Sequence, residues 1–209
     1  MTSLARTDTE EPRRTLRVAP PVLDVDLDAA EQAAAALLHA LGIATDSESL
    51  RGTPGRMVRA YAELFTSPEF DLTTFPNDEG YDELVLARSI PMRSVCEHHL
   101  LPFTGVAHVG YLPRERIIGL SKLARVVGHF AARPQVQERL TKQVSEAIQE
   151  AINPQGVAVI LEAQHLCMMM RGVEKQHSST VTSAMLGVFK TQLQTRNEFL
   201  SLVRQGSTL

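Results

Sequence analysis

The chain has 209 residues, of which 44% are hydrophobic and 22% charged, and its formal net charge is −3. This composition is typical of a soluble globular protein with its own core. The weakly acidic balance argues against a nucleic-acid partner or a membrane surface, and no apolar run approaches the roughly 20 residues of a spanning helix. We therefore expect a cytoplasmic protein.

The N-terminal part divides into a tail and a helical segment. Residues 1–26 have mixed charge, two adjacent prolines and no apolar stretch of the signal-peptide kind, so we expect a flexible tail. Residues 27–66 are expected to be helical. Their alanine-rich first half has helical spacing up to Gly42, and Thr53 and Pro54 are the residue types of an N-cap and a first helical position.

Residues 67–209 are expected to form the main domain. Its first stretch, up to Gly80, has the composition of a loop. Short apolar stretches bounded by proline and glycine then predict strands. These stretches are 83–90, 92–98, 103–112, 116–120, 156–170 and 180–189.

The predicted helices of this domain alternate with the strands in blocks. Ser121 is the candidate cap of the first, which reaches residue 132, and Pro134 is expected to open a longer helix that ends before Asn153. A last helix is expected over 193–206. Because the elements come in blocks rather than in strict βα alternation, the predicted fold class is α+β.

The two cysteines, each close to histidines, indicate a metal site rather than a disulfide. Cys96 and His99 have the C-x-x-H spacing that lets both reach one ion, and Cys167 is the natural third ligand. Catalytic zinc usually takes three protein ligands and keeps one position open. Two alternatives stay open: a structural site with His98 or His165 as fourth ligand, and buried cysteines without a metal.

If the site is catalytic, the unligated histidines gain a role. His98 adjoins a ligand, and His165 stands two residues before Cys167, which in a strand would put both on one face. An open zinc site beside two imidazoles suits hydrolysis with proton transfer.

Basic residues elsewhere could bind phosphate. Lys122 and Arg125 share a helical face just behind Ser121, and a helix N-terminus with two cations can hold a polyphosphate. Arg171 follows the Cys167 stretch, and Arg56 and Arg59 share a face of the second helix. Taken singly, each cation is more often a solvated surface charge.

Gln137 and Glu138 fall in the first turn of a predicted helix. Favourable helix-terminus electrostatics would explain them, and base recognition is the functional alternative. A carboxylate accepts two parallel hydrogen bonds, which matches the N1–H and 2-amino donors of guanine and rejects adenine.

With these stretches assembled, the chain resembles the type I GTP cyclohydrolases. CEHHLLPF, IGLSKLAR, RPQVQERLT, HLCMMMRG and TVTSAMLGVF are similar to the signature stretches of that family, in its order. The resemblance implies the tunnelling fold, a four-stranded antiparallel sheet with two helices on one face. It also implies that subunits join their sheets into a barrel, as a homodecamer with sites at the subunit interfaces.

The resemblance further implies a reaction and a role for each motif residue. GTP would be opened at C8 of guanine, would lose formate and would rearrange to 7,8-dihydroneopterin triphosphate, the first step towards tetrahydrofolate and other pterins. Zinc would be held by Cys96, His99 and Cys167, and His98 and His165 would be the acid–base pair. The remaining motif residues would bind GTP: Gln137 and Glu138 the guanine, Ser121 the base and ribose, and Lys122, Arg125, Arg171, Arg56 and Arg59 the triphosphate.

Two rival functions remain open from the sequence. A related tunnelling-fold nitrile reductase would use a cysteine nucleophile without a zinc triad, which the CEHH and HLC stretches argue against. A non-catalytic, zinc-stabilised binding module would instead require four protein ligands.

Overall fold

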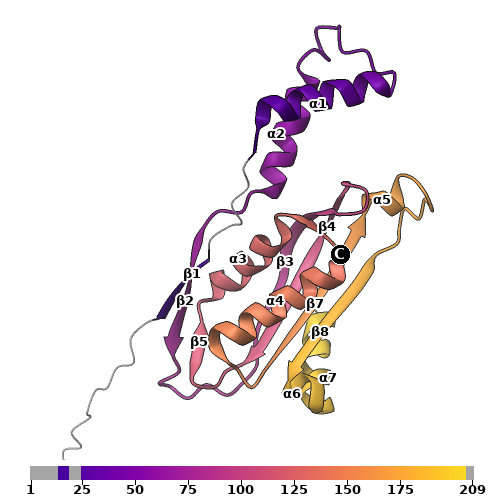
Figure 1. Cartoon of the computed structure of the whole chain (residues 1–209). Coiled ribbons are helices and arrows are strands. Elements are labelled where there is room, and N and C mark those ends of the chain that lie inside the picture. The colour runs from indigo at the N-terminus through magenta and orange to yellow at the C-terminus, as the bar shows by residue number, and fades with distance from the viewer. Residues whose placement is uncertain (1–13, 19–24, 206–209) are drawn as a thin grey trace, which may run out of the picture.

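A five-stranded sheet lies at the centre of the structure, a computed structural model that describes residues 14–18 and 25–205 (Figure 1). The strands follow the order β6-β3-β4-β7-β8. Four are antiparallel neighbours: β3 (Val85–Cys96), β4 (Pro102–Leu112), β7 (Gly156–His165) and β8 (Thr180–Gly187). The two-residue β6 (Pro134–Gln135) runs parallel to the end of β3.

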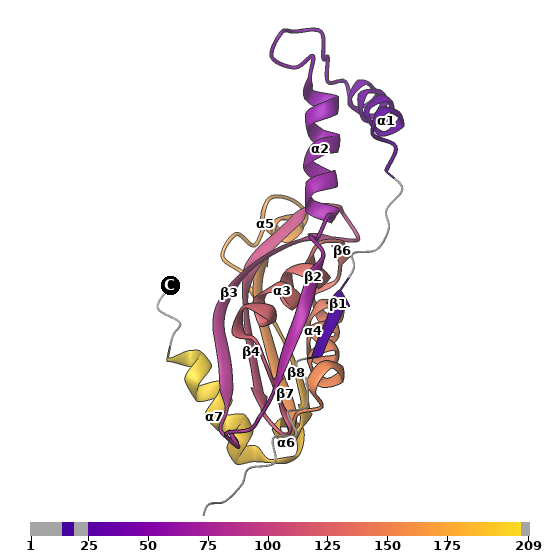
Figure 2. The same cartoon turned by 90° about the vertical axis from the view of Figure 1, so that its left-hand side faces the viewer.

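Helices cover both faces of this sheet. The helices α3 (Leu120–Ala131) and α4 (Gln137–Ile152) lie on one face (Figure 1). The helices α6 (Val188–Thr191) and α7 (Leu193–Arg204) lie on the other (Figure 2). Side chains of β7 alternate between the two layers: Val159 and Leu161 join the core under α3 and α4, and Ile160 packs with Phe189 and Phe199. The predicted α+β fold, with a four-stranded antiparallel sheet and two helices on one face, is confirmed.

A second, three-stranded sheet contains two strands that we did not predict. It pairs β1 (Arg14–Val18), β2 (Phe70–Pro76) and β5 (Arg116–Ile118) in that order. The first falls in the expected tail and the second in the expected loop, so the loop prediction is wrong over 70–76. Residues 1–13 and 19–24 of the expected tail lie outside the described residues.

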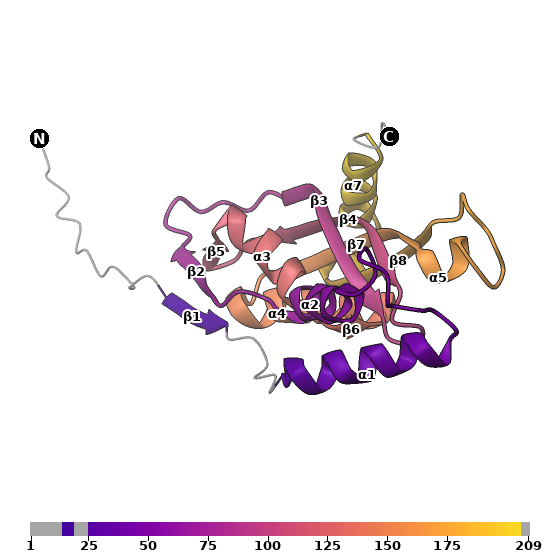
Figure 3. The same ribbon diagram turned by 90° about the horizontal axis from the view of Figure 1, so that it is seen from above.

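The N-terminal helices project from one end of the sheet (Figure 1), and the view from that end shows α2 nearly along its axis (Figure 3). They are α1 (Leu27–Ala40) and α2 (Thr53–Phe65). Asp26 caps α1, because its Oδ1 accepts a hydrogen bond of 2.9 Å from the backbone N–H of Ala29. No helix within the described ranges is long and apolar enough to cross a membrane. The division into segments 27–66 and 67–209 stays a prediction.

Three predicted helix starts are wrong by one to three positions. The N-cap of α2 is Gly52 and that of α3 is Gly119, so neither Thr53 nor Ser121 caps a helix. Pro134 does not open α4. It lies in β6, where it pairs with Val95 of β3, and the helix begins only at Gln137. The N-cap residue is set by the backbone conformation at the end of the preceding segment, and residue type alone predicts it weakly.

The strands β4 and β7 approach closely at Gly105, which lies opposite Ala163. A Cβ atom added to Gly105 would lie 1.9 Å from the backbone oxygen of Glu162 and 2.6 Å from the Cα of Ala163. Glycine is therefore required here by the contact between backbones. Two residues along, the same strand pair contributes Phe103 and His165 to the candidate site.

Candidate metal centre and catalytic site

Three metal-ligating side chains converge at one end of the central sheet. Cys96 ends β3, His99 lies in the turn that follows, and Cys167 lies in the short helix α5 (Leu166–Met169). Their ligand atoms all lie within 4.8 Å of one another. Both cysteines are buried, and neither forms a disulfide. The cluster consists of the three residues that the sequence predicted as metal ligands.

The turn after Cys96 is held by four hydrogen bonds. The amide of Cys96 donates to the carbonyl of Leu101 (2.9 Å), and its carbonyl accepts from the amide of Leu100 (2.8 Å). The next amide along donates to the carbonyl of Gln135 in β6 (3.0 Å), and the hydroxyl of Tyr61 in α2 donates to the carbonyl of Leu100 (3.0 Å). Leu100 has a φ of 52°, a left-handed conformation that leucine rarely adopts. The turn thus presents its histidines from a fixed backbone.

The donor set of this cluster fits zinc. Burial raises the pKa of the Cys167 thiol, and the neighbouring Cys96 raises it further through a hydrogen bond and its charge. A bound cation stabilises thiolates and reverses that tendency. His98 comes close, with its Nδ1 4.0 Å from Cys96 Sγ, but among the described residues only Cys96, His99 and Cys167 form a mutually close set. Three ligands of this kind are typical of a zinc site with an open position.

His165 is the last residue of β7 and is fixed from two sides. Its ring stacks on Phe103, the residue opposite it in β4, with ring centroids 4.4 Å apart and planes 9° apart. Its Nε2 lies 2.8 Å from Oε1 of Gln137 in α4. Burial lowers the pKa of His165, while the negative charge of Glu138 acts in the opposite direction. Because β7 ends here and Cys167 lies in α5, the expectation that both share a strand face is wrong.

His98 has a different environment. Its side chain is 65% exposed, and its Nε2 lies 3.8 Å from Oε1 of the adjacent Glu97. Glu97 pairs in turn with the guanidinium of Arg139 in α4, whose Nε donates to Oε1 of Gln135 (2.9 Å). A solvated imidazole beside a fixed carboxylate is suited to exchange protons with a ligand or with water.

Gln137 and Glu138 are neighbours at the start of α4 and point to different surroundings. Gln137 is 2% exposed, and its Nε2 donates to the carbonyls of Leu161 (3.1 Å) and Thr180 (2.8 Å). Glu138 is exposed, and its charge acts on His165. Within the pair, Glu138 is therefore the side chain that is open to a ligand.

Comparisons with known proteins identify the family of the chain. Residues 30–204 match the model of the family described as GTP cyclohydrolase I. The chain belongs to the GTP cyclohydrolase I family. It is 50% identical over 184 residues to GTP cyclohydrolase 1 of Thermoanaerobacter pseudethanolicus, which covers 86% of this chain and 97% of the relative. It is 51% identical over 184 residues to that of Mycobacterium tuberculosis, covering 85% and 91%.

Solved structures include similar chains. One of them is from the crystal structure of the apo form of an archaeosine synthase QueF-Like, with a TM-score of 0.40 and 21% sequence identity. The match covers 50% of this GTP cyclohydrolase I family chain and 93% of the other chain.

In this family member, the predicted phosphate-binding residues do not all lie with the metal cluster. Arg171 follows α5, and its positive charge acts to lower the pKa of Cys167. Ser121 and Lys122 lie in the first turn of α3, and Arg125 lies in its second turn. The other end of α3 approaches β3 close to Cys96, because Ser94 Oγ donates a hydrogen bond of 2.7 Å to the carbonyl of Ala131. The helix rises by about 15 Å between Ser121 and Ala131, so the start of α3 lies away from the metal cluster.

The arginines of α2 lie on the projecting N-terminal helices of the family member. Arg56 donates to the carbonyl of Ser49 (2.8 Å) and to Oγ1 of Thr53 (2.7 Å), and Arg59 is exposed. A single chain therefore brings together the predicted metal ligands, His98, His165, Gln137 and Glu138, but leaves most of the predicted triphosphate ligands apart.

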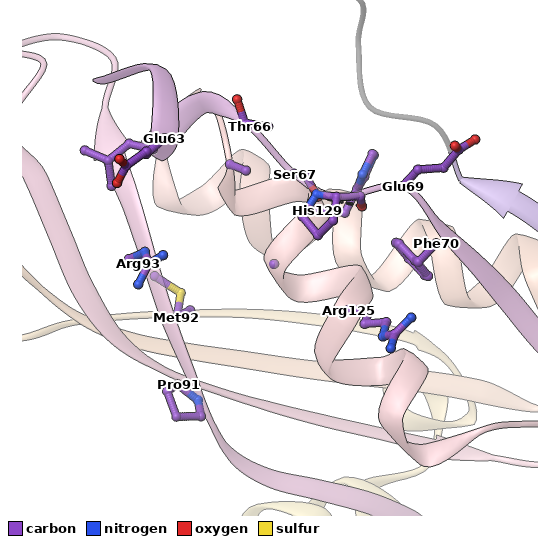
Figure 4. Close-up of a pocket in the computed structure, with 14 residues that line it drawn as sticks. Glu63, Thr66, Ser67, Glu69, Phe70, Pro91, Met92, Arg93, Arg125 and His129 are labelled. Atoms are coloured by element: carbon purple, nitrogen blue, oxygen red, sulfur yellow. Dashed lines mark hydrogen bonds between the residues drawn. The ribbon is translucent and has the colours of Figure 1, made fainter. Parts of the chain in front are cut away.

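A cavity of about 610 Å³ lies beside β3, away from the cysteines. Its walls come from the end of α2, the start of β2, β3 and α3, with Arg93 and Arg125 standing on different walls (Figure 4). Arg125 is the one predicted site residue among those that line it.

Two residues beside the metal cluster were not predicted from the sequence. The role of Phe103 depends on strand register, and that of Arg139 depends on a contact with a residue 42 positions away in the chain.

Proposed function

We propose that the chain is a zinc-dependent GTP cyclohydrolase. It opens the guanine imidazole ring at C8, releases formate and forms 7,8-dihydroneopterin triphosphate, the first step of tetrahydrofolate and pterin biosynthesis. The observation that carries this proposal is the three-ligand cluster with two further histidines beside it, in a member of the GTP cyclohydrolase I family.

Cys96, His99 and Cys167 would hold the zinc ion. When bound there, zinc lowers the pKa of a water molecule and so supplies a nucleophile at neutral pH. His98 donates a proton to the ring nitrogen that departs from C8, for which its exposed position beside Glu97 is suitable. His165 serves the later proton transfers, in which the freed amine closes onto the rearranged ribose.

Glu138 accepts hydrogen bonds from the N1–H and 2-amino groups of guanine. Its exposure supports this role. Gln137 was predicted to share the task, and that contact stays a prediction. Ser121 is proposed to lie near the base and ribose. The triphosphate is bound by cations that the sequence analysis selected: Lys122, Arg125, Arg171, Arg56 and Arg59.

The complete site is proposed to form between subunits of a cytoplasmic homodecamer. Two features of the described chain support assembly. Several of the predicted triphosphate ligands lie away from the metal cluster, and β8 and most of β3 are free edges of the central sheet among the described residues. Free edges pair readily with further strands, so sheets of neighbouring subunits can join into a barrel.

The test is incubation of purified, zinc-loaded protein with GTP, with formate and the pterin chromophore measured together. We expect both products from GTP, none from ATP, and none after treatment with a chelator. Formate without pterin would contradict the later steps. No formate from a zinc-loaded oligomer would contradict the proposal and favour a zinc-stabilised binding module.

A further inference from the structure

We propose that Gln137 is a positioning residue, which holds the imidazole of His165 in one tautomer and one ring orientation. The inference rests on the proposed function only in giving His165 a proton to transfer. It assigns to Gln137 a task other than the reading of guanine.

The orientation of the Gln137 amide is determined by its surroundings. Its Nε2 lies 3.1 Å from the carbonyl oxygen of Leu161 and 2.8 Å from that of Thr180. Carbonyl oxygens only accept hydrogen bonds, so the NH₂ end must face them. A flipped amide would bury an oxygen against two oxygens, and at 2% exposure water could not compensate. Both amide hydrogens are therefore used, and Oε1 faces His165.

This orientation selects the tautomer of His165. Oε1 of Gln137 can only accept, so Nε2 of His165, 2.8 Å away, must carry a proton. In the neutral ring Nδ1 is then the unprotonated nitrogen. The same hydrogen bond persists when the ring is protonated, because Nε2 carries hydrogen in both states.

A second contact fixes the plane of the same ring. Phe103 stacks on His165 with centroids 4.4 Å apart and planes 9° apart. Stacking leaves rotation within the plane open, and the hydrogen bond from Nε2 to Gln137 removes it. Because Gln137 also bonds the carbonyls of Leu161 in β7 and Thr180, the first residue of β8, its own position is tied to the central sheet.

The proposal separates Gln137 from Glu138 experimentally. A residue that reads guanine contributes to GTP binding, so its loss raises KM. A residue that orients a proton-transfer group lowers kcat and leaves KM nearly unchanged. Gln137→Met is suitable, because methionine has a similar length and lacks both the acceptor and the donors.

A matched control comes from the same buried layer between α4 and the sheet. Ser145 is 1% exposed, and its Oγ donates to the carbonyl of Lys142 at 2.8 Å. Ser145→Ala removes that hydrogen bond and leaves the contacts of Gln137 and His165 in place. We expect kcat for formate and pterin formation to fall about tenfold or more in Gln137→Met, with zinc content and KM for GTP retained. Ser145→Ala should keep the wild-type kcat. A raised KM with unchanged kcat would overturn the proposal in favour of base reading.

A double-mutant cycle tests whether Gln137 acts through His165. In a His165→Ala background, Gln137→Met should lower kcat by less than about twofold, because the group that it orients is absent. A loss as large as in the wild-type background would overturn the proposal, since Gln137 would then act independently of His165.

The crystal structure of the zinc-loaded Gln137→Met protein provides a readout that needs no turnover. We expect the imidazole of His165 to rotate within the stacking plane or to take a new partner at Nε2. An unchanged ring with unchanged partners would overturn the proposal. The wild-type GTP assay decides the proposed function separately, so failure of one can be told from failure of the other.

Discussion

At the scale of single residues, the start of α4 shows how one helical turn separates two tasks. Successive residues of an α-helix point about 100° apart, so Gln137 enters the layer between helix and sheet while its neighbour Glu138 meets solvent. The buried member is fixed by His165 and two backbone carbonyls. The exposed member keeps both carboxylate oxygens for a ligand, and its substitution should affect substrate binding.

Glu138→Gln should raise KM for GTP about tenfold or more, because an amide offers one acceptor to the two donors of guanine and sets an N–H against the other. Steady-state kinetics of formate release measure the change. Glu146 is an exposed residue of the same helix and pairs with Lys142 at 3.6 Å, so Glu146→Gln should leave KM unchanged. Equal KM values for Glu138→Gln and wild type would refute the guanine contact.

Cys167→Ser should weaken zinc binding about tenfold or more, since serine is a poor substitute for the thiolate that zinc prefers. Zinc retained per chain after dialysis against a chelator, measured by elemental analysis, gives the result. Met168→Leu, an adjacent substitution in α5, serves as the control and should retain zinc. Full retention in Cys167→Ser would show that Cys167 is not a ligand.

At the scale of elements, the pair β4 and β7 carries Phe103 and His165 into register, and Gly105 sets the closeness of that pair. The added methyl group of Gly105→Ala would meet backbone atoms that cannot rotate away. The two strands would have to separate next to the stacked rings.

We expect Gly105→Ala to lower the free energy of unfolding by about 3 kcal/mol or more, seen as a lower midpoint in thermal unfolding followed by circular dichroism. Gly128→Ala is the control with the opposite sign. Its added Cβ meets nothing within 4 Å, and alanine favours a helix interior by about 1 kcal/mol over glycine. A Gly105→Ala protein as stable as wild type would contradict the close approach.

Periodicity along the chain predicted the elements whose partners are local or whose pattern is long, such as β4, α4 and α7. It missed β1 and β2, because their pairing joins residues 14–18 to residues 70–74, far apart in the sequence. It also predicted that β7 continues through Cys167, because a run of apolar residues does not distinguish a strand from a short helix.

The candidate site divides in the same way. The C-x-x-H spacing predicted two metal ligands, because it acts within one turn of the chain. The partners of Gln137 could not be predicted, because they lie 24, 28 and 43 residues away, at positions fixed only by the folded sheet.

At the scale of the whole molecule, the metal cluster lies at one end of the sheet. Lys122 lies in the first turn of α3, at the end of that helix that is farther from the cluster. In the proposed assembly, these groups serve one GTP molecule and come from different subunits. A site shared in this way can be rebuilt from two defective proteins.

Cys96→Ser and Lys122→Met should each be inactive alone and regain activity when unfolded and refolded together. Random co-assembly of equal amounts gives on the order of one quarter of the sites both intact halves. A mixture of Cys96→Ser and Cys167→Ser should stay inactive, because both changes affect the same half. Formate release from the mixtures is the measurement. Absence of recovery in a mixed oligomer would contradict the shared site.

The turn after Cys96 depends on segments that are distant in the sequence. Its backbone is hydrogen-bonded to the carbonyl of Gln135 in β6 and to the hydroxyl of Tyr61 in α2. Because α2 belongs to the projecting N-terminal helices, the packing of those helices against the sheet helps to hold the backbone that carries His99. A substitution in α2 can therefore weaken metal binding although it touches no ligand.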